Sequence, residues 1–186
     1  MRIIAGRYRS RVLKTVAGLA VRPTPDRLRE AMFNVLGEEV KGRTFLDAYA
    51  GSGAVGLEAL SRGASHVTLM EKSPAALAVI RENVQSLGVG AEVTVLRGSA
   101  GRLLGTVAAA IAFVDPPYEQ VNQYGSSLLA LSETACELVI AQHPSRLALE
   151  EQYGQLQRQR VLRQGDNSLS FYKRAELNAQ AEGERP

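Results

Sequence analysis

The stretch LDAYAGSGAVG, residues 46–56, is the part of the sequence that decides the fold. A short apolar run at 44–46 leads into it, and a segment with helical character, 54–62, follows. Gly51, Gly53 and Gly56 have the spacing G-x-G-x-x-G, which lets the backbone turn tightly and lets a ligand approach the main chain. The stretch therefore predicts a ligand-binding loop between a strand and a helix of an α/β domain.

The rest of the chain repeats this alternation of apolar runs and helical segments. Further strands are expected at 66–70, 92–96, 109–114 and 137–141, and helices at 74–87, 99–105 and 122–132. Residues 154–163 and 168–175, on either side of the turn residues 164–167, add an antiparallel hairpin. The pattern predicts a Rossmann-like α/β fold with a doubly wound, mostly parallel seven-stranded sheet and helices on both faces.

The first 43 residues differ from the rest of the chain in charge. They carry a net charge of +6 and the remaining residues carry −3. Short strands around a turn are expected at 2–6 and 11–15, followed by a helix from Pro25 to Leu36 with Thr24 as its N-cap and Gly37 after its end. We therefore divide the chain into a basic extension (1–43), an α/β domain (44–175) and a disordered tail (176–186).

Arginines dominate the beginning of this extension. Because guanidinium groups match phosphate geometry, and because a basic arm gains affinity by releasing condensed counterions, the extension is expected to contact a polyphosphate such as RNA. The arginines within the first 27 residues are Arg2, Arg7, Arg9, Arg11, Arg22 and Arg27.

Composition sets the protein class. The 186 residues are 45% apolar and 22% charged, which suits one soluble globular domain. A lone Cys136 excludes an internal disulfide and is expected to be buried, while the isolated His66 and His143 are read as packing or surface residues, so no metal site is expected. No signal-peptide core and no run of about 18 apolar residues occurs, and a cytoplasmic location is expected.

Two acidic residues indicate which ligand the glycine loop binds. Asp47 stands four residues before Gly51, where its carboxylate would repel the pyrophosphate of a dinucleotide. S-adenosylmethionine has no phosphate and carries an ammonium and a sulfonium that a carboxylate attracts. Glu71 closes the next strand, a position that suits hydrogen bonds to a ribose diol. S-adenosylmethionine is therefore the expected cofactor, and a dinucleotide oxidoreductase is disfavoured.

A second motif, Asp115-Pro116-Pro117-Tyr118, ends the fourth strand of the α/β domain. Ligands of open α/β sheets bind at the carboxyl ends of the strands, so this motif should lie beside the cofactor. The Asp115 carboxylate and the Pro116 carbonyl can hold the two N–H groups of an exocyclic amine, and prolines fix these acceptors in advance. Tyr118 can stack on an unstacked base. The motif predicts methyl transfer to an amino group of a nucleic-acid base.

These motifs, with several in the N-terminal region, resemble those of the RsmD family, the bacterial 16S rRNA guanine-N2 methyltransferases of class I. The resemblance covers roughly residues 2–173. The residues that carry it are Arg2–Gly6, Arg22–Thr24, Asp26–Arg27, Arg29–Ala31, Phe33–Asn34, Asp47, Gly51–Gly53, Gly56–Ala64 and Asp115–Tyr118.

The resemblance implies specific sites and partners. The amine site would be Asp115, Pro116, Pro117 and Tyr118, and the substrate would be 16S rRNA in a partly or fully assembled small ribosomal subunit. Apart from the resemblance, a monomer is the default expectation. Tyr49 stands where related loops often have Phe, and Ser99 where many have Asp or Asn for the adenine amino group, a task that backbone groups of Ala100 can share. The cofactor residues would be Asp47, Tyr49, Gly51, Ser52, Gly53, Glu71, Lys72, Ser99 and Ala100, and the RNA-binding residues Arg2, Arg7, Arg9, Arg11, Arg22, Thr24 and Arg27.

Two other functions remain open at this point. An adenine-N6 methyltransferase would use the same Asp115–Tyr118 motif, so the motif alone does not choose between the bases. A methyltransferase fold that binds nucleic acid without catalysis is a second alternative, which the intact Asp115 and glycine loop oppose.

Overall fold

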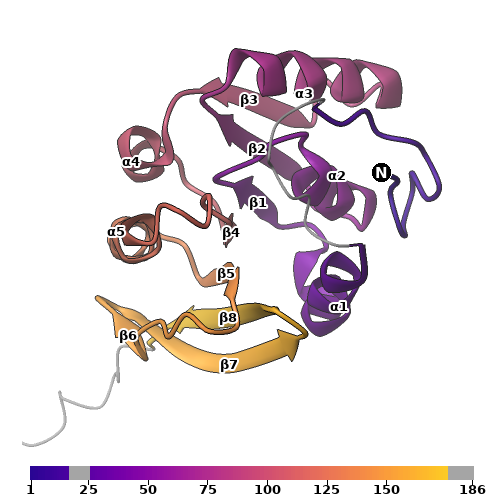
Figure 1. The fold of residues 1–186 in the computed structure, drawn as a ribbon. Coiled ribbons are helices and arrows are strands. Elements are labelled where there is room, and N and C mark those ends of the chain that lie inside the picture. The colour runs from indigo at the N-terminus through magenta and orange to yellow at the C-terminus, as the bar shows by residue number, and fades with distance from the viewer. Residues whose placement is uncertain (17–25, 176–186) are drawn as a thin grey trace, which may run out of the picture.

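One eight-stranded sheet forms the centre of the molecule, in the order β3-β2-β1-β4-β5-β8-β7-β6 (Figure 1). The computed structural model describes residues 1–16 and 26–175. Strands β1 to β5 pair in parallel, and β8, β7 and β6 continue the sheet in antiparallel pairs. The strands are β1 Thr44–Asp47, β2 His66–Glu71, β3 Val93–Arg97, β4 Ile111–Val114, β5 Leu138–Pro144, β6 Gln152–Tyr153, β7 Leu156–Gln164 and β8 Asn167–Arg174.

Helices cover both faces of this sheet (Figure 1). Side chains of α1, α2 and α3 share one core cluster with Phe45 and Phe113, whereas α4 and α5 share a second cluster with Leu46 and Val114. Within the described residues no helix is long and apolar enough to cross a membrane. The helices are α1 Asp26–Leu36, α2 Ala54–Ser61, α3 Pro74–Leu87, α4 Ala100–Leu103 and α5 Asn122–Ser132, with short 3-10 turns at Gly37–Val40 and Leu104–Thr106.

The two clusters follow from the two-residue period of a strand. Successive side chains point to opposite faces, so Phe45 meets one helical layer and Leu46 the other. All residues of β4 are buried, which explains the continuous apolar run that the sequence shows there. The doubly wound, mostly parallel α/β fold predicted from the sequence is confirmed.

The sheet has eight strands where seven were predicted. The additional strand is β6, which pairs with the start of β7 at Tyr153 and Leu156 across a turn with Gly154 at φ +54°. A two-residue strand is too short to show the alternation that marks a strand in sequence. The predicted strand 154–163 accordingly begins at Leu156 and ends at Gln164, and β8 follows after the turn residues Gly165 and Asp166.

The N-terminal arm, residues 1–16, is a loop closed by one bridge rather than the predicted pair of strands. Arg2 and Val12 form that bridge, and Ser10, with φ 67°, lies in the turn between them. The arm gains its order from α2: the Glu58 carboxylate accepts hydrogen bonds from the backbone N–H groups of Ile4 (2.7 Å) and Ala5 (3.1 Å). Contacts between residues 54 positions apart leave no local pattern in the sequence. The sequence therefore predicted two paired strands and not an arm held by α2.

The arm and α1 pack against the α/β core. Ile3 and Leu13 of the arm and Leu28 of α1 belong to the same core cluster as Phe45. Gly6 has φ +81°, and a Cβ atom there would lie 1.8 Å from the Ser61 carbonyl oxygen, so only glycine permits this close approach to α2. Of the predicted helix start, Thr24 and Pro25 lie outside the described residues, and α1 is described from Asp26.

Candidate active site

Four polar side chains meet at the carboxyl edge of the sheet, on the face covered by α1, α2 and α3. Each stands two residues after an apolar residue of that core cluster, and the strand period therefore puts all four on the same face. In the register of β4 and β5, Val114 pairs with Ala141, so the residues that follow them are level with each other. The four side chains are Asp47, Glu71, Asp115 and Gln142, after Phe45, Leu69, Phe113 and Ile140 respectively.

A cavity of about 810 Å³ opens at this edge. Ligand cavities for small molecules have volumes of roughly 300–1,000 Å³, so a nucleoside of the size of S-adenosylmethionine fits. Thr15 and Val16 of the N-terminal arm border it. Its walls bring together most of the predicted site residues: Asp47, Tyr49, Gly51, Ser52, Glu71, Lys72, Ser99, Ala100, Asp115, Pro116, Pro117 and Tyr118.

Gly53, predicted to bind the cofactor, is not part of the cavity wall and lies instead at the start of α2. With φ +80° it is the N-cap of α2, and a Cβ atom there would lie 3.1 Å from Leu69 Cδ1. The residue thus shapes the turn that presents Gly51 and Ser52, and does not itself face the cavity.

Asp47 is a buried carboxylate with one unused oxygen. Its Oδ2 accepts a hydrogen bond from the Gly56 N–H at 3.2 Å, whereas Oδ1 is buried and has no hydrogen-bond partner in the described part of the chain. Burial raises the pKa of Asp47 to about 7, although the hydrogen bond from the backbone N–H of Gly56 opposes the rise. A ligand cation beside Oδ1 would give the carboxylate the counter-charge that it lacks. The unpartnered Oδ1 atom therefore fits the ammonium group of S-adenosylmethionine.

Glu71 is held in place by three backbone N–H groups. Its Oε2 accepts from Gly51 at 2.9 Å, and its Oε1 accepts from Lys72 and Ser73, both at 2.8 Å. A carboxylate offers about four lone-pair sites, so capacity remains for a ribose hydroxyl. The contact with Gly51 joins this acid to the glycine loop and fixes both at the cavity.

The Asp115–Tyr118 motif lies on the opposite side of the cavity from Glu71 in the strand order, after β4. The Tyr118 hydroxyl donates a hydrogen bond to Asn167 Oδ1 on β8, and the residue as a whole is 37% exposed. The pKa of Tyr124 is raised far above its usual range, mainly by burial and secondly by the negative charge of Asp115. The motif therefore presents one ionisable carboxyl and an aromatic ring anchored at its hydroxyl.

The structure also shows where the lone cysteine, the two histidines and Ser99 lie. Cys136 is buried, as predicted, and burial raises the pKa of its thiol to about 12. His66 contacts Thr94 and His143 contacts Ser170, each at hydrogen-bond distance. Ser99 lines the cavity at the N-cap of α4, where its side chain makes no capping hydrogen bond.

Sequence reasoning missed Gln142. This residue of β5 is 2% exposed and lines the cavity, and its Oε1 has no hydrogen-bond partner among the described residues. A signal was present: a polar residue directly follows the apolar run 137–141, at the strand end where ligands bind.

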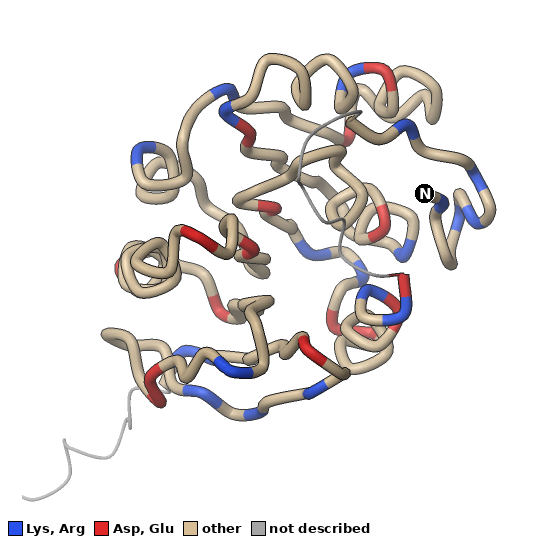
Figure 2. Tube along the Cα trace, in the orientation of Figure 1, with Lys and Arg blue, Asp and Glu red and all other residues tan. Residues whose placement is uncertain are grey.

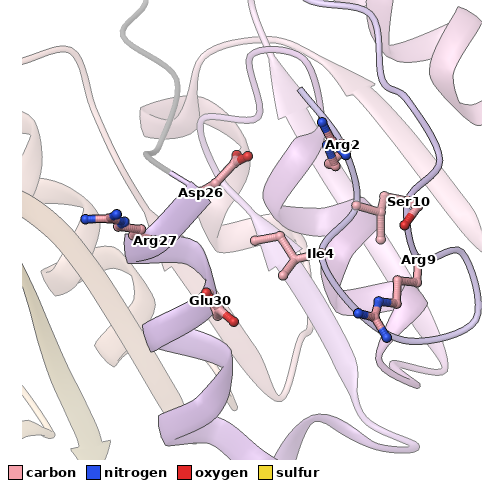
Figure 3. Close-up of a pocket in the computed structure, with 8 residues that line it drawn as sticks. Arg2, Ile4, Arg9, Ser10, Asp26, Arg27 and Glu30 are labelled. Atoms are coloured by element: carbon pink, nitrogen blue, oxygen red, sulfur yellow. The ribbon is translucent and has the colours of Figure 1, made fainter.

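The structure brings three of the predicted RNA-binding arginines to one hollow of about 300 Å³. Arg2 and Arg9 of the arm lie on one side of it, and Arg27 lies with Asp26 and Glu30 on α1 (Figure 3). Arg22 and Thr24 lie outside the described residues.

Two further arginines of the arm already have partners. Arg7 forms an ion pair with Glu92 at 2.6 Å and Arg11 donates to the Ser86 carbonyl at 2.7 Å, so both fasten the arm to the domain. Figure 2 shows additional basic residues along β7 and β8, which the net charge of −3 over the whole of residues 44–186 conceals. They are Arg158, Arg160, Arg163, Lys173 and Arg174.

A doubly wound sheet with a glycine loop after β1, acids closing β1 and β2, and Asp-Pro-Pro-Tyr after β4 defines a class I methyltransferase, whose cofactor is S-adenosylmethionine. Residues 1–173 match the family described as Conserved hypothetical protein 95, and the chain belongs to that family. The resemblance to the RsmD family is thereby confirmed.

Individual relatives agree with this assignment. YlbH of Bacillus subtilis, provisionally named an rRNA methyltransferase, is 34% identical over 94% of this chain and 99% of its own length. Ribosomal RNA small subunit methyltransferase D of Escherichia coli K12 is 39% identical over 64% of this chain and 61% of its own. The solved structure of YhhF from Escherichia coli, provisionally named a methyltransferase, superposes with a TM-score of 0.83 at 32% identity, covering 94% of this chain and 97% of that one.

Proposed function

We propose that this protein transfers a methyl group from S-adenosylmethionine to the exocyclic N2 of a guanine in 16S rRNA of the small ribosomal subunit. The observation that carries the proposal is the placement of Asp115–Tyr118 in the same cavity as Asp47 and Glu71. The names of relatives, which refer to rRNA and to the small subunit, support the choice of substrate.

Within the cavity, the cofactor and the amine have separate places. The cofactor ammonium would lie at Asp47 Oδ1, its ribose at Glu71, and its base near Ser99 and Ala100, with Tyr49, Gly51, Ser52 and Lys72 completing the wall. When bound, S-adenosylmethionine supplies an electrophilic methyl group on sulfur. Glu71 is already anchored by three backbone N–H groups, so this half of the site is organised before the cofactor arrives.

The residues after β4 would prepare the amine nitrogen for attack. The Asp115 carboxylate and the Pro116 carbonyl accept its two N–H groups, which concentrates the nitrogen lone pair on the side away from them. As the new N–C bond forms and the S–C bond breaks, the excess proton on nitrogen passes to Asp115 or to water. The ring of Tyr118, held by Asn167, stacks on the base.

The RNA backbone would follow the arm to the cavity. Arg2 and Arg9 are exposed at one hollow, Arg27 is exposed on α1 with its guanidinium pointing away from them (Figure 3), and Thr15 and Val16 at the end of the arm border the cavity. Phosphate contacts by such groups fix the register of the RNA and leave base recognition to the cavity.

The first test is methyl transfer from labelled S-adenosylmethionine to small subunits and to their stripped RNA, taken from cells that lack the enzyme. N2-methylguanosine among the digested nucleosides is expected. N6-methyladenosine would overturn the choice of base and favour the adenine alternative. Cofactor binding without transfer to either substrate would contradict rRNA as the substrate.

Cofactor affinity should depend on pH through Asp47. Because the pKa of its carboxyl is raised to about 7, the carboxylate that attracts an ammonium is largely protonated at pH 6 and largely ionised at pH 8. The affinity for S-adenosylhomocysteine, which keeps the ammonium, should therefore rise about tenfold between pH 6 and pH 8. Calorimetry in two buffers of different ionisation enthalpy would also detect the released proton.

Two variants make this pH experiment specific. Asp47→Asn should bind weakly at both pH values, since it cannot ionise, whereas Asp115→Asn should keep the wild-type pH dependence. A pH-independent affinity in the wild-type protein would contradict the role given to Asp47.

A further inference from the structure

The cavity wall contains one buried polar group that the mechanism above does not use. The side chain of Gln142 is 2% exposed, and its Oε1 has no hydrogen-bond partner in the described part of the chain. Buried acceptors are almost always hydrogen-bonded, because losing water without a replacement costs free energy. An acceptor kept in this state at a ligand cavity is expected to find its partner on a ligand.

The backbone fixes where this acceptor lies. Gln142 follows Ala141, which pairs with Val114, so Gln142 of β5 stands beside Asp115 at the end of β4. Gln142 and Asp115 each come two residues after a member of the same core cluster, Ile140 and Phe113, and therefore project from the same face of the sheet. Neighbouring strands are about 4.8 Å apart, so two side-chain acceptors face one edge of a bound base.

Neighbouring polar residues do not compete for this role. The imidazole of His143, next in sequence, contacts the Ser170 hydroxyl at 2.9 Å and the Pro144 carbonyl at 3.0 Å. Gln123, another amide at the cavity, donates its Nε2 hydrogen to Gln120 Oε1. Gln123 is only half-buried, so its carbonyl oxygen is not a desolvated acceptor, whereas the carbonyl oxygen of Gln142 is buried and has no partner among the described residues.

We propose that Gln142 Oε1 accepts the ring N1–H of the target base and thereby selects guanine over adenine. This inference rests on the proposed guanine-N2 activity and adds the residue that recognises the base. Guanine presents two neighbouring donors on one edge, the N2 amino group and N1–H, which match Asp115 and Gln142. Adenine N1 is an acceptor, so an adenine in the same place would oppose one lone pair with another.

The test compares two acceptor bases in one RNA. Small-subunit RNA would be prepared with guanine or with 2-aminopurine at the nucleotide that the wild-type enzyme methylates. 2-Aminopurine keeps the amino group and lacks the hydrogen on N1. The ratio of kcat/KM for guanine to kcat/KM for 2-aminopurine should fall by roughly 10- to 100-fold in Gln142→Met, because the variant removes the acceptor and keeps the side-chain length.

Controls separate base recognition from damage to the site. Gln123→Met makes the same chemical change at the same cavity and should leave the ratio unchanged, since the half-buried Gln123 does not hold a buried, unpartnered acceptor. Gln142→Glu keeps an acceptor at this position and should retain most of the preference for guanine. The rise in Tm produced by S-adenosylhomocysteine should be the same in all three variants, which confirms an intact cofactor half.

The outcomes distinguish this inference from the function on which it rests. If the wild-type product is N2-methylguanosine and Gln142→Met keeps the full preference for guanine, the role of Gln142 is refuted and the proposed function stands. If the wild-type product is another nucleoside, the proposed function fails whatever Gln142 does.

Discussion

Replacement of Asp115 by Asn or Ala should lower the rate of methyl transfer by about 10²–10⁴-fold while cofactor binding persists. Asp115 lines the cavity after β4, on the side proposed for the amine, whereas Asp47 and Glu71 end β1 and β2. In the proposed mechanism the variant loses both the charged acceptor that orients the amine and the group that takes its proton. Single-turnover methylation of saturating small subunits measures the loss directly.

A matched variant tests whether the effect belongs to this carboxylate. Glu119 lines the same cavity four residues later and is exposed. Glu119→Gln removes one negative charge from the cavity mouth and should change the rate by far less than Asp115→Asn. Equal losses in both variants would mean that the cavity needs its overall charge and not a positioned acceptor. Wild-type turnover by Asp115→Ala would refute the mechanism.

The sequence was informative wherever a contact is local or periodic. Apolar runs placed β1 to β5, and the residue after each run placed Asp47, Glu71 and Asp115 at one edge of the sheet. The glycine loop was recognisable because G-x-G-x-x-G occupies a strand–turn–helix context. These features depend on spacings of a few residues, which a single sequence displays.

Features that depend on long-range contacts were not predictable. β6 has two residues and exists only through its pairing with β7. Gln142 becomes a candidate site residue only because it lies beside Asp115, 27 positions earlier. That proximity follows from the strand order and register, which the sequence does not display. Glu58 reads as an ordinary surface residue of a helix, yet its side chain is fully buried because the arm, more than 50 residues upstream, lies over it.

The loss of Glu58 should cause the largest change in stability. Its carboxylate accepts from the backbone of Ile4 and Ala5 and from Arg62 Nε at 2.8 Å, and it lies 3.7 Å from Nε of the fully buried Arg29. Removing one partner of a buried charge cluster leaves the others desolvated without compensation, which typically costs about 3–5 kcal/mol. Burial lowers the pKa of Arg29, and Glu58 is the larger of the two acidic influences that oppose this.

Glu58→Ala is therefore expected to lower the free energy of unfolding in urea by about 3–5 kcal/mol, a large part of the stability of a domain of this size. Asp26, at 3.1 Å from Arg29, is half-exposed and cannot replace the lost partner. Because Glu58 accepts the hydrogen bonds of the backbone amides of Ile4 and Ala5, the same variant should also speed hydrogen exchange at these two amides.

Glu92→Ala is the matched control, because it also breaks an ion pair between the arm and the domain. That pair, with Arg7, lies at the surface, where water and salt weaken charge interactions, so its loss should change stability little. If both variants destabilised the protein equally, burial would not be the source of the effect and the arm would be held by its charges alone. If Glu58→Ala were as stable as the wild type, the arm would be held by the packing of Ile3 and Leu13, and the buried carboxylate would contribute nothing to its anchoring.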